Sequence, residues 1–250
     1  MSRLVLEEID LGFSRLPIGF DGFRILQISD LHMVREPGDR ERLIARRVSE
    51  VQPDMLVLTG DLANRPRAQA SVSTWLASLR NPDLRYAVPG NWDYKWHADS
   101  RAFEETMRDA GFTALCNRSA RVERRGSTIQ LVGIDDVNAG CPDPAKAFRD
   151  VDRDDFVIAL CHNPDILLDP AASRFDLMLS GHTHGGQIRL PLFGAVITST
   201  RLWKRFEAGL YEVGREQFVY VSRGVGTGGL NIRVLCPPEL AVLTLRHGVS

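Results

Sequence analysis

Cysteine is scarce in this chain and shows no pairing pattern. The 250 residues include four cysteines, Cys116, Cys141, Cys161 and Cys236, and none of them forms a Cys-x-x-Cys pair. Such scatter gives no disulfide framework, so we expect reduced thiols that mostly serve as small core side chains. Long apolar runs are missing as well. Residues 1–20 alternate charged and apolar residues, and no later stretch could span a bilayer. We therefore expect a cytoplasmic protein without a signal peptide.

An excess of charge of one sign is also absent. The formal net charge is −1, and no basic tract is interleaved with aromatic residues, which argues against a nucleic-acid partner. Basic groups at residues 121–125 and around Arg201, Lys204 and Arg205 fit an ordinary solvated surface. Hydrophobic content of 44% and charged content of 25% are typical of a globular protein. We expect one domain over residues 1–250, with a sizeable core.

The first half of the chain alternates predicted strands and helices. Short apolar runs closed by turn residues predict buried strands at 24–29, 55–59, 156–160 and 176–179. Helical spacing predicts helices at 39–51, 68–79 and 100–110, the first with Asp39 as N-cap and Pro53 as stop. This alternation favours parallel strand pairing with covering helices.

The later chain changes character. Residues 121–134 resemble a hairpin that turns at Gly126, and residues 210–213, 218–221, 231–235 and 240–245 predict antiparallel strands. The fold class that fits both halves is α/β, a four-layer α/β/β/α sandwich with two mixed sheets. Loops that leave the carboxyl ends of strands in such a fold meet at one edge.

Clusters of potential metal ligands follow five of the apolar runs. They are Asp30-Leu31-His32, Gly60-Asp61, Gly90-Asn91-Trp92-Asp93, His162-Asn163 and Gly181-His182-Thr183-His184. One such cluster alone means little, because loops after strands often carry Asp or a structural His. Four of the six histidines of the chain fall in these clusters, however, so the set as a whole predicts a metal centre.

The residue types in the clusters indicate the chemistry. In an extended segment, Asp30 and His32 would point the same way, and Asp61 follows a glycine and has two oxygens that can bridge two ions. Mixed imidazole and carboxylate ligands suit Mn, Fe or Zn rather than Ca or Mg. Two divalent ions held by two aspartates keep positive charge for a bridging hydroxide and an anionic phosphate ester. Ions about 3.5–4 Å apart can activate that hydroxide.

The order of these clusters resembles that of calcineurin-like metallophosphoesterases. The stretches SDLH, TGDL, PGNWDY, CHNPD, GHTHGGQIRLP, SRGVGTGG and CPPE further resemble a bacterial branch of that family. This branch contains membrane-associated phosphoesterases and UDP-2,3-diacylglucosamine hydrolases. The resemblance implies the metallophosphoesterase fold and two metal sites. One site would consist of Asp30, His32, Asp61 and His184, and the other of Asp61, Asn91, His162 and His182.

The same resemblance assigns further roles. It implies that Asp61, Asn91 and His162 take part in catalysis and that Asp93 orients the site. Asn163 and Asp165 either share that role or belong to a simple turn before Pro164. Cys161 is expected to point away from the site into the core.

Trp92 departs from the family pattern, in which many members have a histidine that protonates the leaving group. An indole N–H is no usable acid, so we expect a preference for aryl esters or pyrophosphates, whose leaving groups need little protonation. Tyr94, Lys95 or His97 could replace the missing acid. Trp92 itself could stack on a substrate or merely fill space.

The predicted function is therefore a two-metal phosphodiesterase, with a nucleotide–lipid pyrophosphate or a similar diester as its substrate. A phosphomonoesterase and a metal-free binding scaffold are the alternatives. The segment 188–206, rich in apolar residues and cations, could bind an acyl chain or touch a membrane surface, or it could pack under the sheet edge. The physiological substrate, the native metal and the oligomeric state stay open.

Overall fold

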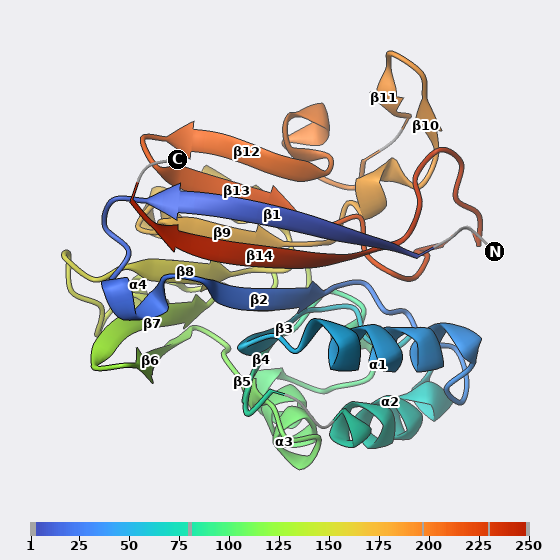
Figure 1. Ribbon diagram of the computed structural model, residues 1–250. Coiled ribbons are helices and arrows are strands. Elements are labelled where there is room, and N and C mark those ends of the chain that lie inside the picture. The colour runs from blue at the N-terminus through green and yellow to red at the C-terminus, as the bar shows by residue number, and fades with distance from the viewer. Residues whose placement is uncertain (1–3, 80–81, 197, 230, 249–250) are drawn as a thin grey trace.

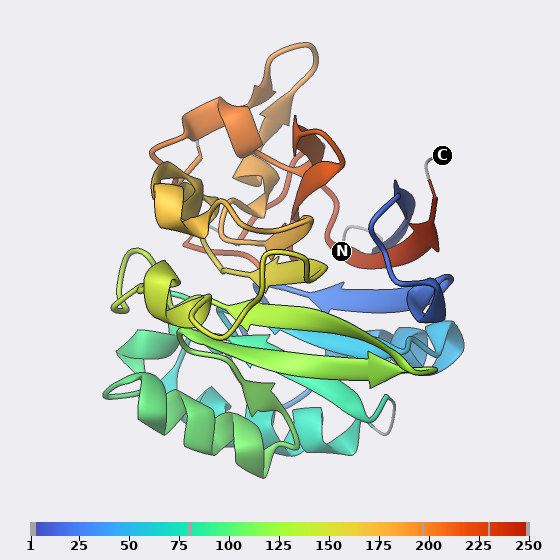
Figure 2. The ribbon, with the colours of Figure 1, turned by 90° about the vertical axis from the view of Figure 1, so that its left-hand side faces the viewer.

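Two six-stranded sheets pack face to face in this protein, with helices on their outer sides (Figures 1 and 2). The structure is a computed structural model that describes residues 4–79, 82–196, 198–229 and 231–248. The α/β fold class with two mixed sheets is therefore confirmed. Among the helices in these ranges, none has both the length and the apolar composition needed to cross a bilayer.

The first sheet contains most of the parallel strands predicted for the first half of the chain. Its order is β1 (Val5–Phe13), β14 (Glu239–His247), β2 (Phe23–Ile28), β3 (Met55–Thr59), β4 (Leu84–Val88) and β5 (Thr113–Ala114). Strands β2 to β5 pair in parallel, whereas β14 runs antiparallel to β2 and parallel to β1. Strands β1 and β4 extend the predictions: the alternating pattern near the N-terminus forms a half-buried strand beside the C-terminal one.

The second sheet is also mixed. Its order is β12 (Gly209–Gly214), β13 (Gln217–Val221), β9 (Leu177–Ser180), β8 (Val157–Leu160), β7 (Ser127–Gly133) and β6 (Arg118–Arg124). The predicted hairpin is β6 and β7, which turn at 125–126. The expectation of antiparallel strands after residue 206 holds for β12 with β13, but β13 pairs in parallel with β9.

The strand predicted at 231–235 is wrong. This segment makes only an isolated bridge, between Val234 and Ile188. The Arg233 side chain instead folds inward and donates to the carbonyls of Arg223 and Gly226. These side-chain hydrogen bonds hold the segment as a loop in place of a strand ladder.

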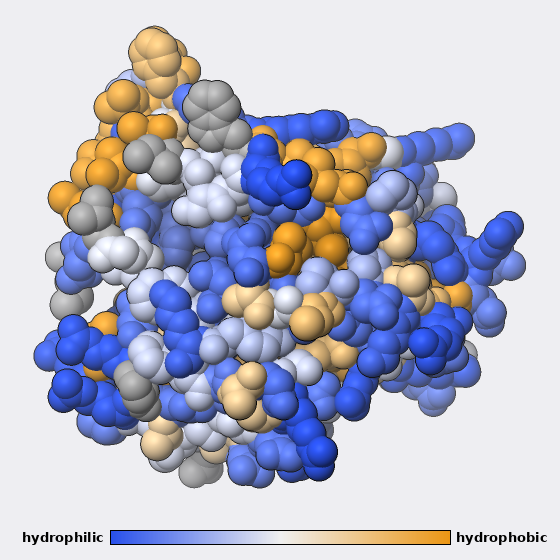
Figure 3. Space-filling view, turned by 180° about the vertical axis from the view of Figure 1, so that it is seen from behind, coloured by the Kyte–Doolittle hydropathy of each residue, from blue (hydrophilic) through white to orange (hydrophobic). Residues whose placement is uncertain are grey.

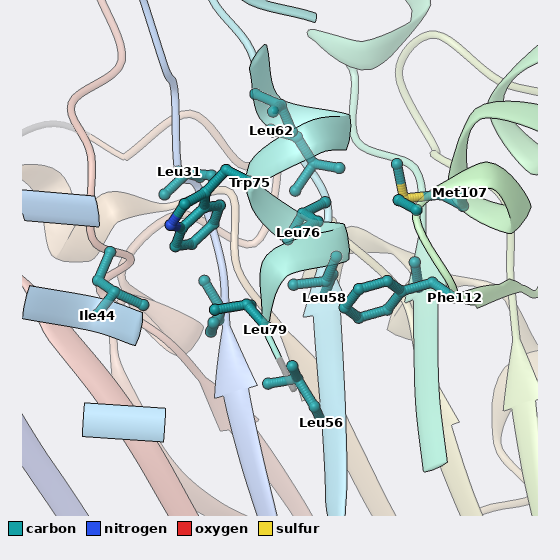
Figure 4. Packing of buried hydrophobic residues seen from close by; sticks show 14 of the residues in the cluster. Leu31, Ile44, Leu56, Leu58, Leu62, Trp75, Leu76, Leu79, Met107 and Phe112 are labelled. Carbon is teal, nitrogen blue, oxygen red and sulfur yellow. The ribbon is translucent and has the colours of Figure 1, made fainter. Parts of the chain in front are cut away.

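Helices α1 (Asp39–Val51), α2 (Pro66–Ser78) and α3 (Ser100–Asp109) cover the outer face of the first sheet (Figure 1). Their apolar faces interlock with Leu56 and Leu58 of β3 (Figure 4). Asp39 is not the N-cap of α1 as expected. Gly38 holds that position and donates its N–H to Glu41 Oε2 at 2.8 Å. Asp39 lies in the first turn, where its negative charge still favours the helix dipole.

The outer layer on the second sheet is thinner. It consists of α4 (Pro144–Ala147) and short 3₁₀ helices, including Pro164–Leu168, Pro170–Ala172 and Trp203–Phe206. A separate apolar cluster lies between the sheets and includes Phe13 and Phe156, whose rings meet edge to face with centroids 5.0 Å apart. Burial on both faces explains why the central strands read as continuous apolar runs.

A buried glutamine links the two sheets directly below one edge. Gln27 Nε2 donates to Thr59 Oγ1 at 2.8 Å within the first sheet and to Ser180 O at 2.9 Å in the second. All three residues are fully buried. Because this edge receives the carboxyl ends of parallel strands from both sheets, the loops that follow them are held in one place.

Candidate metal centre

Two compact groups of potential ligands lie at the edge above Gln27. One group contains Asp30, His32 and His184, and the other contains Asp61, His162 and His182. Within each group the donor atoms lie within 4.8 Å of one another, and all six residues are buried. Both groups combine loops after β2 or β3 with loops after β8 or β9. Neither group is therefore complete in one sheet alone.

Asp61, a member of the second group, also approaches the first group. Its Oδ2 atom is 3.4 Å from His32 Nε2 in one group and 3.4 Å from His162 Nε2 in the other. The remaining oxygen, Oδ1, accepts a hydrogen bond from the backbone N–H of Trp92 at 2.8 Å. This geometry fits a carboxylate that contributes to both groups.

Three of the four histidines turn one ring nitrogen to the centre and place the other beside an oxygen atom of the chain. His162 Nδ1 lies 2.6 Å from Thr59 O, His32 Nδ1 lies 2.5 Å from Asn64 Oδ1, and His182 Nε2 lies 3.1 Å from Ser199 O. The facing nitrogens come close: His32 Nε2 lies 3.1 Å from His184 Nε2. Such anchoring of the far nitrogen fixes ring orientation at metal sites.

Asn91 has the free acceptor that a metal ligand requires. Its Oδ1 atom is buried and has no hydrogen-bond partner among the described residues. An orphaned buried acceptor is costly unless another group occupies its lone pairs. Asn91 follows Gly90, which contacts Asp61 and His162 closely. The donor set thus fits divalent ions in chemistry as well as in spacing.

The ligand loops are strained. Five candidate ligands, Asp30, His32, Asp61, His182 and His184, have φ between 46° and 68°. The expectation of an extended Asp30–His32 segment is therefore wrong. A left-handed backbone costs a residue other than glycine about 1–3 kcal/mol. Such strain persists where function requires it, and here it accompanies the placement of His182 and His184, two positions apart, in different groups.

Two glycines allow the loops to approach each other. A Cβ atom on Gly60, where φ is 83°, would lie 2.7 Å from Gly90 Cα and 2.8 Å from His162 Nδ1. A Cβ atom on Gly181 would collide with Ser29 Oγ and with Asp30 Oδ2. Because any larger residue would displace a candidate ligand, both sites need glycine.

Burial favours the neutral form of two of the imidazoles, those of His182 and His184. Burial lowers the pKa of His184 to about 4 and, together with the charge of His162, lowers that of His182. Neutral imidazole is the form that binds metal. Burial also disfavours protonation of His162, but the Asp61 and Asp30 carboxylates outweigh it and raise the His162 pKa well above its usual value. Carboxylates buried this deeply need positive partners.

Asp93 organises the backbone around the candidate centre. Its Oδ2 accepts hydrogen bonds from the N–H groups of Asp61 and Gly90, both at 2.8 Å, and its Oδ1 accepts one from Leu62 at 2.9 Å. Burial, followed by the charge of Asp61, raises the Asp93 pKa to about 7. The carboxylate thus ties the loop after β3 to the loop after β4.

The structure separates the three candidates for the missing acid near Trp92. His97 is buried against Phe103, and its Nε2 lies 2.6 Å from Gln69 Nε2. The Tyr94 hydroxyl donates to Asp135. Lys95 alone of the three lies against the Trp92 ring.

Other predicted residues take structural places. Asn163 Oδ1 accepts the N–H of Asp165 at 2.9 Å, which is the simple turn expected as one alternative. Asp165 in turn accepts the N–H groups of Arg201 and Leu202, so it fastens that later segment. Cys161 is fully buried in the core outside the second sheet, as expected.

Asp136 is a site residue that the sequence motifs did not reveal. It follows β7, is fully buried, and accepts the N–H groups of Asn138 and Ala139 through Oδ1. Its Oδ2 has no hydrogen-bond partner among the described residues. Burial raises the pKa of the Asp136 carboxyl group, and the charges of His162 and His182 oppose that rise. The signal was present, because Asp135-Asp136 closes an apolar run like the other clusters.

Two mixed sheets with paired ligand groups at one edge define a metal-dependent phosphoesterase. The sequence profile of the family described as "Calcineurin-like phosphoesterase" matches residues 23–186, a range that holds every candidate ligand. The chain belongs to the calcineurin-like phosphoesterase family and is a metal-dependent phosphoric ester hydrolase.

Several relatives support this assignment. The metallophosphoesterase YkuE of Bacillus subtilis is 34% identical over 238 residues, which cover 93% of this chain and 82% of YkuE. Phosphodiesterase YaeI of Escherichia coli is 34% identical, with coverage of 89% and 82%. UDP-2,3-diacylglucosamine pyrophosphatase LpxG of Chlamydia trachomatis is 30% identical, with coverage of 89% and 83%.

A solved structure confirms the fold. The NAD nucleotidase of Haemophilus influenzae superimposes with a TM-score of 0.54 at 12% identity over 81% of this chain. This chain spans about half of that longer protein, 50% of its length. At this identity, the likeness concerns the fold alone.

Proposed function

We propose that the protein is a two-metal phosphodiesterase or pyrophosphatase. The observation that carries the proposal is the position of Asp61 Oδ2, 3.4 Å from a histidine nitrogen of each ligand group. In this proposal one ion is held by Asp30, His32, Asp61 and His184. The second is held by Asp61, Asn91, His162 and His182. The orphaned Asn91 Oδ1 supports the second set.

Bound ions of this kind would activate water and stabilise negative charge on the phosphate oxygens. The chain itself does the positioning. Thr59 and Asn64 fix the rings of His162 and His32, and Asp93 fixes the backbone N–H groups that carry Asp61 and Gly90. Mn, Fe or Zn suits this ligand set of imidazole, carboxylate and amide oxygen.

The substrate that we favour is a diester or pyrophosphate with a good leaving group. The family resemblance puts Trp92 where many members have a proton-donating histidine, and an indole N–H is no usable acid. The relatives named phosphodiesterase YaeI and UDP-2,3-diacylglucosamine pyrophosphatase LpxG support the same choice. A nucleotide–lipid pyrophosphate therefore is the specific substrate class that we propose.

The test combines metal analysis with a substrate panel. The protein would be loaded with Mn, Fe or Zn in turn and assayed on an aryl phosphodiester, an aryl phosphomonoester and a nucleotide–lipid pyrophosphate. We expect about two ions per chain and the highest kcat/KM on the diester or pyrophosphate. Preference for the monoester would favour the phosphomonoesterase alternative, and absence of any turnover would favour a binding scaffold.

Two further expectations from the sequence remain proposals. The first is that residues 1–250 form one domain. It is supported by the ligand groups, each of which contains residues from loops of both sheets. The cytoplasmic location stays a prediction.

A further inference from the structure

An apolar hairpin projects from the molecule beside the metal centre. Strands β10 (Arg189–Leu190) and β11 (Gly194–Ala195) form it, and its tip stands clear of the sandwich (Figure 1). Leu192 at the tip is 104% exposed and Phe193 is 73% exposed. The alternative that this segment packs under the sheet edge is wrong for the tip, although Phe206 further along is buried. Ile197 and the Trp203 side chain lie outside the described residues.

A second segment extends the same surface. Residues 231–235 run beside the start of the hairpin, where Arg189 N donates to Val234 O at 3.0 Å and Val234 N donates to Gln187 O at 2.8 Å. Of the thirteen exposed large hydrophobic residues in the described ranges, seven lie on these two segments. We call this set the apolar projection: Leu190, Leu192, Phe193, Val196, Ile232, Val234 and Leu235. Figure 3 shows hydrophobic colouring gathered on a protruding corner of the molecule.

Two leucines of the apolar projection have a left-handed backbone conformation, which is unfavourable for leucine. Leu192 has φ 70° and Leu235 has φ 52°. Leu192 follows Pro191 in a turn closed by Phe193 N and Leu190 O at 3.2 Å, and glycine is the usual residue at its position in such a turn. Leu235 is 66% exposed. Both side chains are largely exposed, so burial within the described residues offsets little of the cost of these backbone conformations.

Cations flank the apolar projection. Residues 188–207 contain four basic residues and one acidic residue, in a chain of net charge −1. Arg189 pairs with the acidic residue, Glu207, at 2.6 Å. Arg201, Lys204 and Arg205 are exposed, and Lys204 Nζ donates to Phe193 O at 2.9 Å. This bond places an ammonium group directly at the base of the tip.

We propose that the apolar projection is a membrane-docking surface that enters the interface of a bilayer containing anionic lipid. Apolar side chains backed by lysine and arginine match the layered chemistry of that interface, with acyl chains below and anionic head groups above. The convex shape supports lipid over a protein partner, because a stable protein interface needs about 800 Å² from each side. A narrow hairpin tip suits insertion between lipids instead.

The docking surface is joined to the metal centre from two directions. The hairpin continues from His184 through Gln187, whose side chain donates to Gly228 O at 2.8 Å and accepts from Gly228 N at 2.9 Å. A Cβ atom on Gly228 would lie 2.8 Å from His184 Nε2. Docking would therefore hold the centre close to the lipid surface. The binding itself is independent of the proposed chemistry and can be measured without turnover.

The test is co-sedimentation of the full chain with vesicles of phosphatidylcholine alone or mixed with phosphatidylglycerol. We expect stronger binding to the anionic vesicles, weakened by salt. The double variant Leu192→Ser/Phe193→Ser should lose affinity by at least about tenfold, because two apolar side chains no longer enter the interface. Lys204→Glu/Arg205→Glu should lose a similar factor on anionic vesicles only.

Ile18→Ser is the matched control, since Ile18 is 66% exposed on a separate 3₁₀ helix, Ile18–Phe20. Thermal unfolding and turnover of a small water-soluble diester would show that each variant is intact. Equal vesicle binding by the wild type and the tip variant would overturn the proposal, as would an equal loss in Ile18→Ser. Tip-dependent self-association without vesicle binding would also overturn it and make the surface a protein interface.

Discussion

The Lys95 ammonium nitrogen lies 3.1 Å from the centre of the Trp92 indole ring. The same ring meets His32 edge to face, with centroids 5.5 Å apart. Through its ring, Trp92 therefore contacts both the exposed Lys95 and the candidate metal ligand His32. Its backbone N–H separately holds Asp61 Oδ1, so replacing the indole leaves that hydrogen bond in place.

Trp92→His should reduce the dependence of rate on the leaving group. General acid catalysis contributes about 10²–10⁴-fold when a proton donor is correctly placed, and imidazole supplies the donor that indole lacks. We expect kcat/KM for a series of aryl diesters to fall less steeply with leaving-group pKa in the variant. Lys95→Met tests whether the lysine already supplies protons: a steeper slope would show that it does. If Trp92→His leaves the slope unchanged, another residue supplies the proton or no proton donor is needed.

Asp61→Asn should disturb both candidate metal sites at once. The change removes charge from the carboxylate that lies 3.4 Å from both groups. Changes beside metal ligands cost about 10–100-fold in affinity, so loss at a shared ligand should cost at least about 100-fold in activity. Elemental analysis should give fewer ions than the wild type, whereas the exposed control Asp109→Asn should retain them. Two tightly bound ions in Asp61→Asn would disprove the shared role.

Asp136→Asn should weaken the group that contains His162 and His182. Asparagine keeps the Oδ1 acceptor for Asn138 and Ala139 but removes the negative charge of the unpartnered Oδ2. We expect metal affinity at this group to fall about 10–100-fold, measured by competition with a chelator. The metal-free variant should be at least as stable to denaturant as the metal-free wild type at neutral pH, because burial raises the pKa of the Asp136 carboxyl group. A drop in stability without a change in metal affinity would make Asp136 purely structural.

The stability of the fold should depend on pH through Asp176, a buried carboxyl group whose hydrogen bond and ion pair involve none of the candidate metal ligands. It accepts the N–H of Val157 at 2.7 Å and pairs with Arg15 at 3.1 Å, but burial raises the pKa of its carboxyl group. The folded state therefore binds this proton more tightly than the unfolded state. The free energy of unfolding should fall as pH rises between the two pKa values and stay level above them.

Asp176→Asn should remove that pH dependence. Relative to the wild type, the variant should gain stability as pH rises from about 4 through the folded pKa of Asp176. Urea unfolding midpoints across this range measure the effect, with the exposed Asp150→Asn as control. A constant difference between variant and wild type at every pH would mean that lost hydrogen bonds, and not ionisation, dominate.

The sequence predicted the parts of this protein that depend on local pattern. Apolar runs closed by turn residues marked β2, β3, β8 and β9 correctly, because burial on both faces leaves a continuous signal. The clusters that contain Asp61 and Asp93 also follow apolar runs, whereas the roles expected for these two residues came from the family resemblance. The segment 231–235 was wrongly predicted as a strand. Its conformation depends on hydrogen bonds from the Arg233 side chain to the carbonyls of Arg223 and Gly226. No local pattern reports such contacts.

The backbone of the ligand loops was equally hidden. Asp30 and His32 were expected on an extended segment, yet both have positive φ. The fold imposes this conformation through contacts between loops from different sheets, such as Gly181 against Asp30 and Gly224 against Asp30. Residue types were readable from the sequence, whereas the directions of the side chains required the tertiary structure.

The division of ligands between the sheets has a mechanical consequence. Asp30, His32 and Asp61 follow strands of the first sheet, whereas His162, His182 and His184 follow strands of the second. In the proposed two-metal state, each ion would act as a cross-link between the sheets, beside the uncharged link made by Gln27. Pulling the sandwich apart with a single-molecule force probe should then require less force after chelation, because the ions would no longer share the load with Gln27, the apolar core and the direct hydrogen bonds between the sheets.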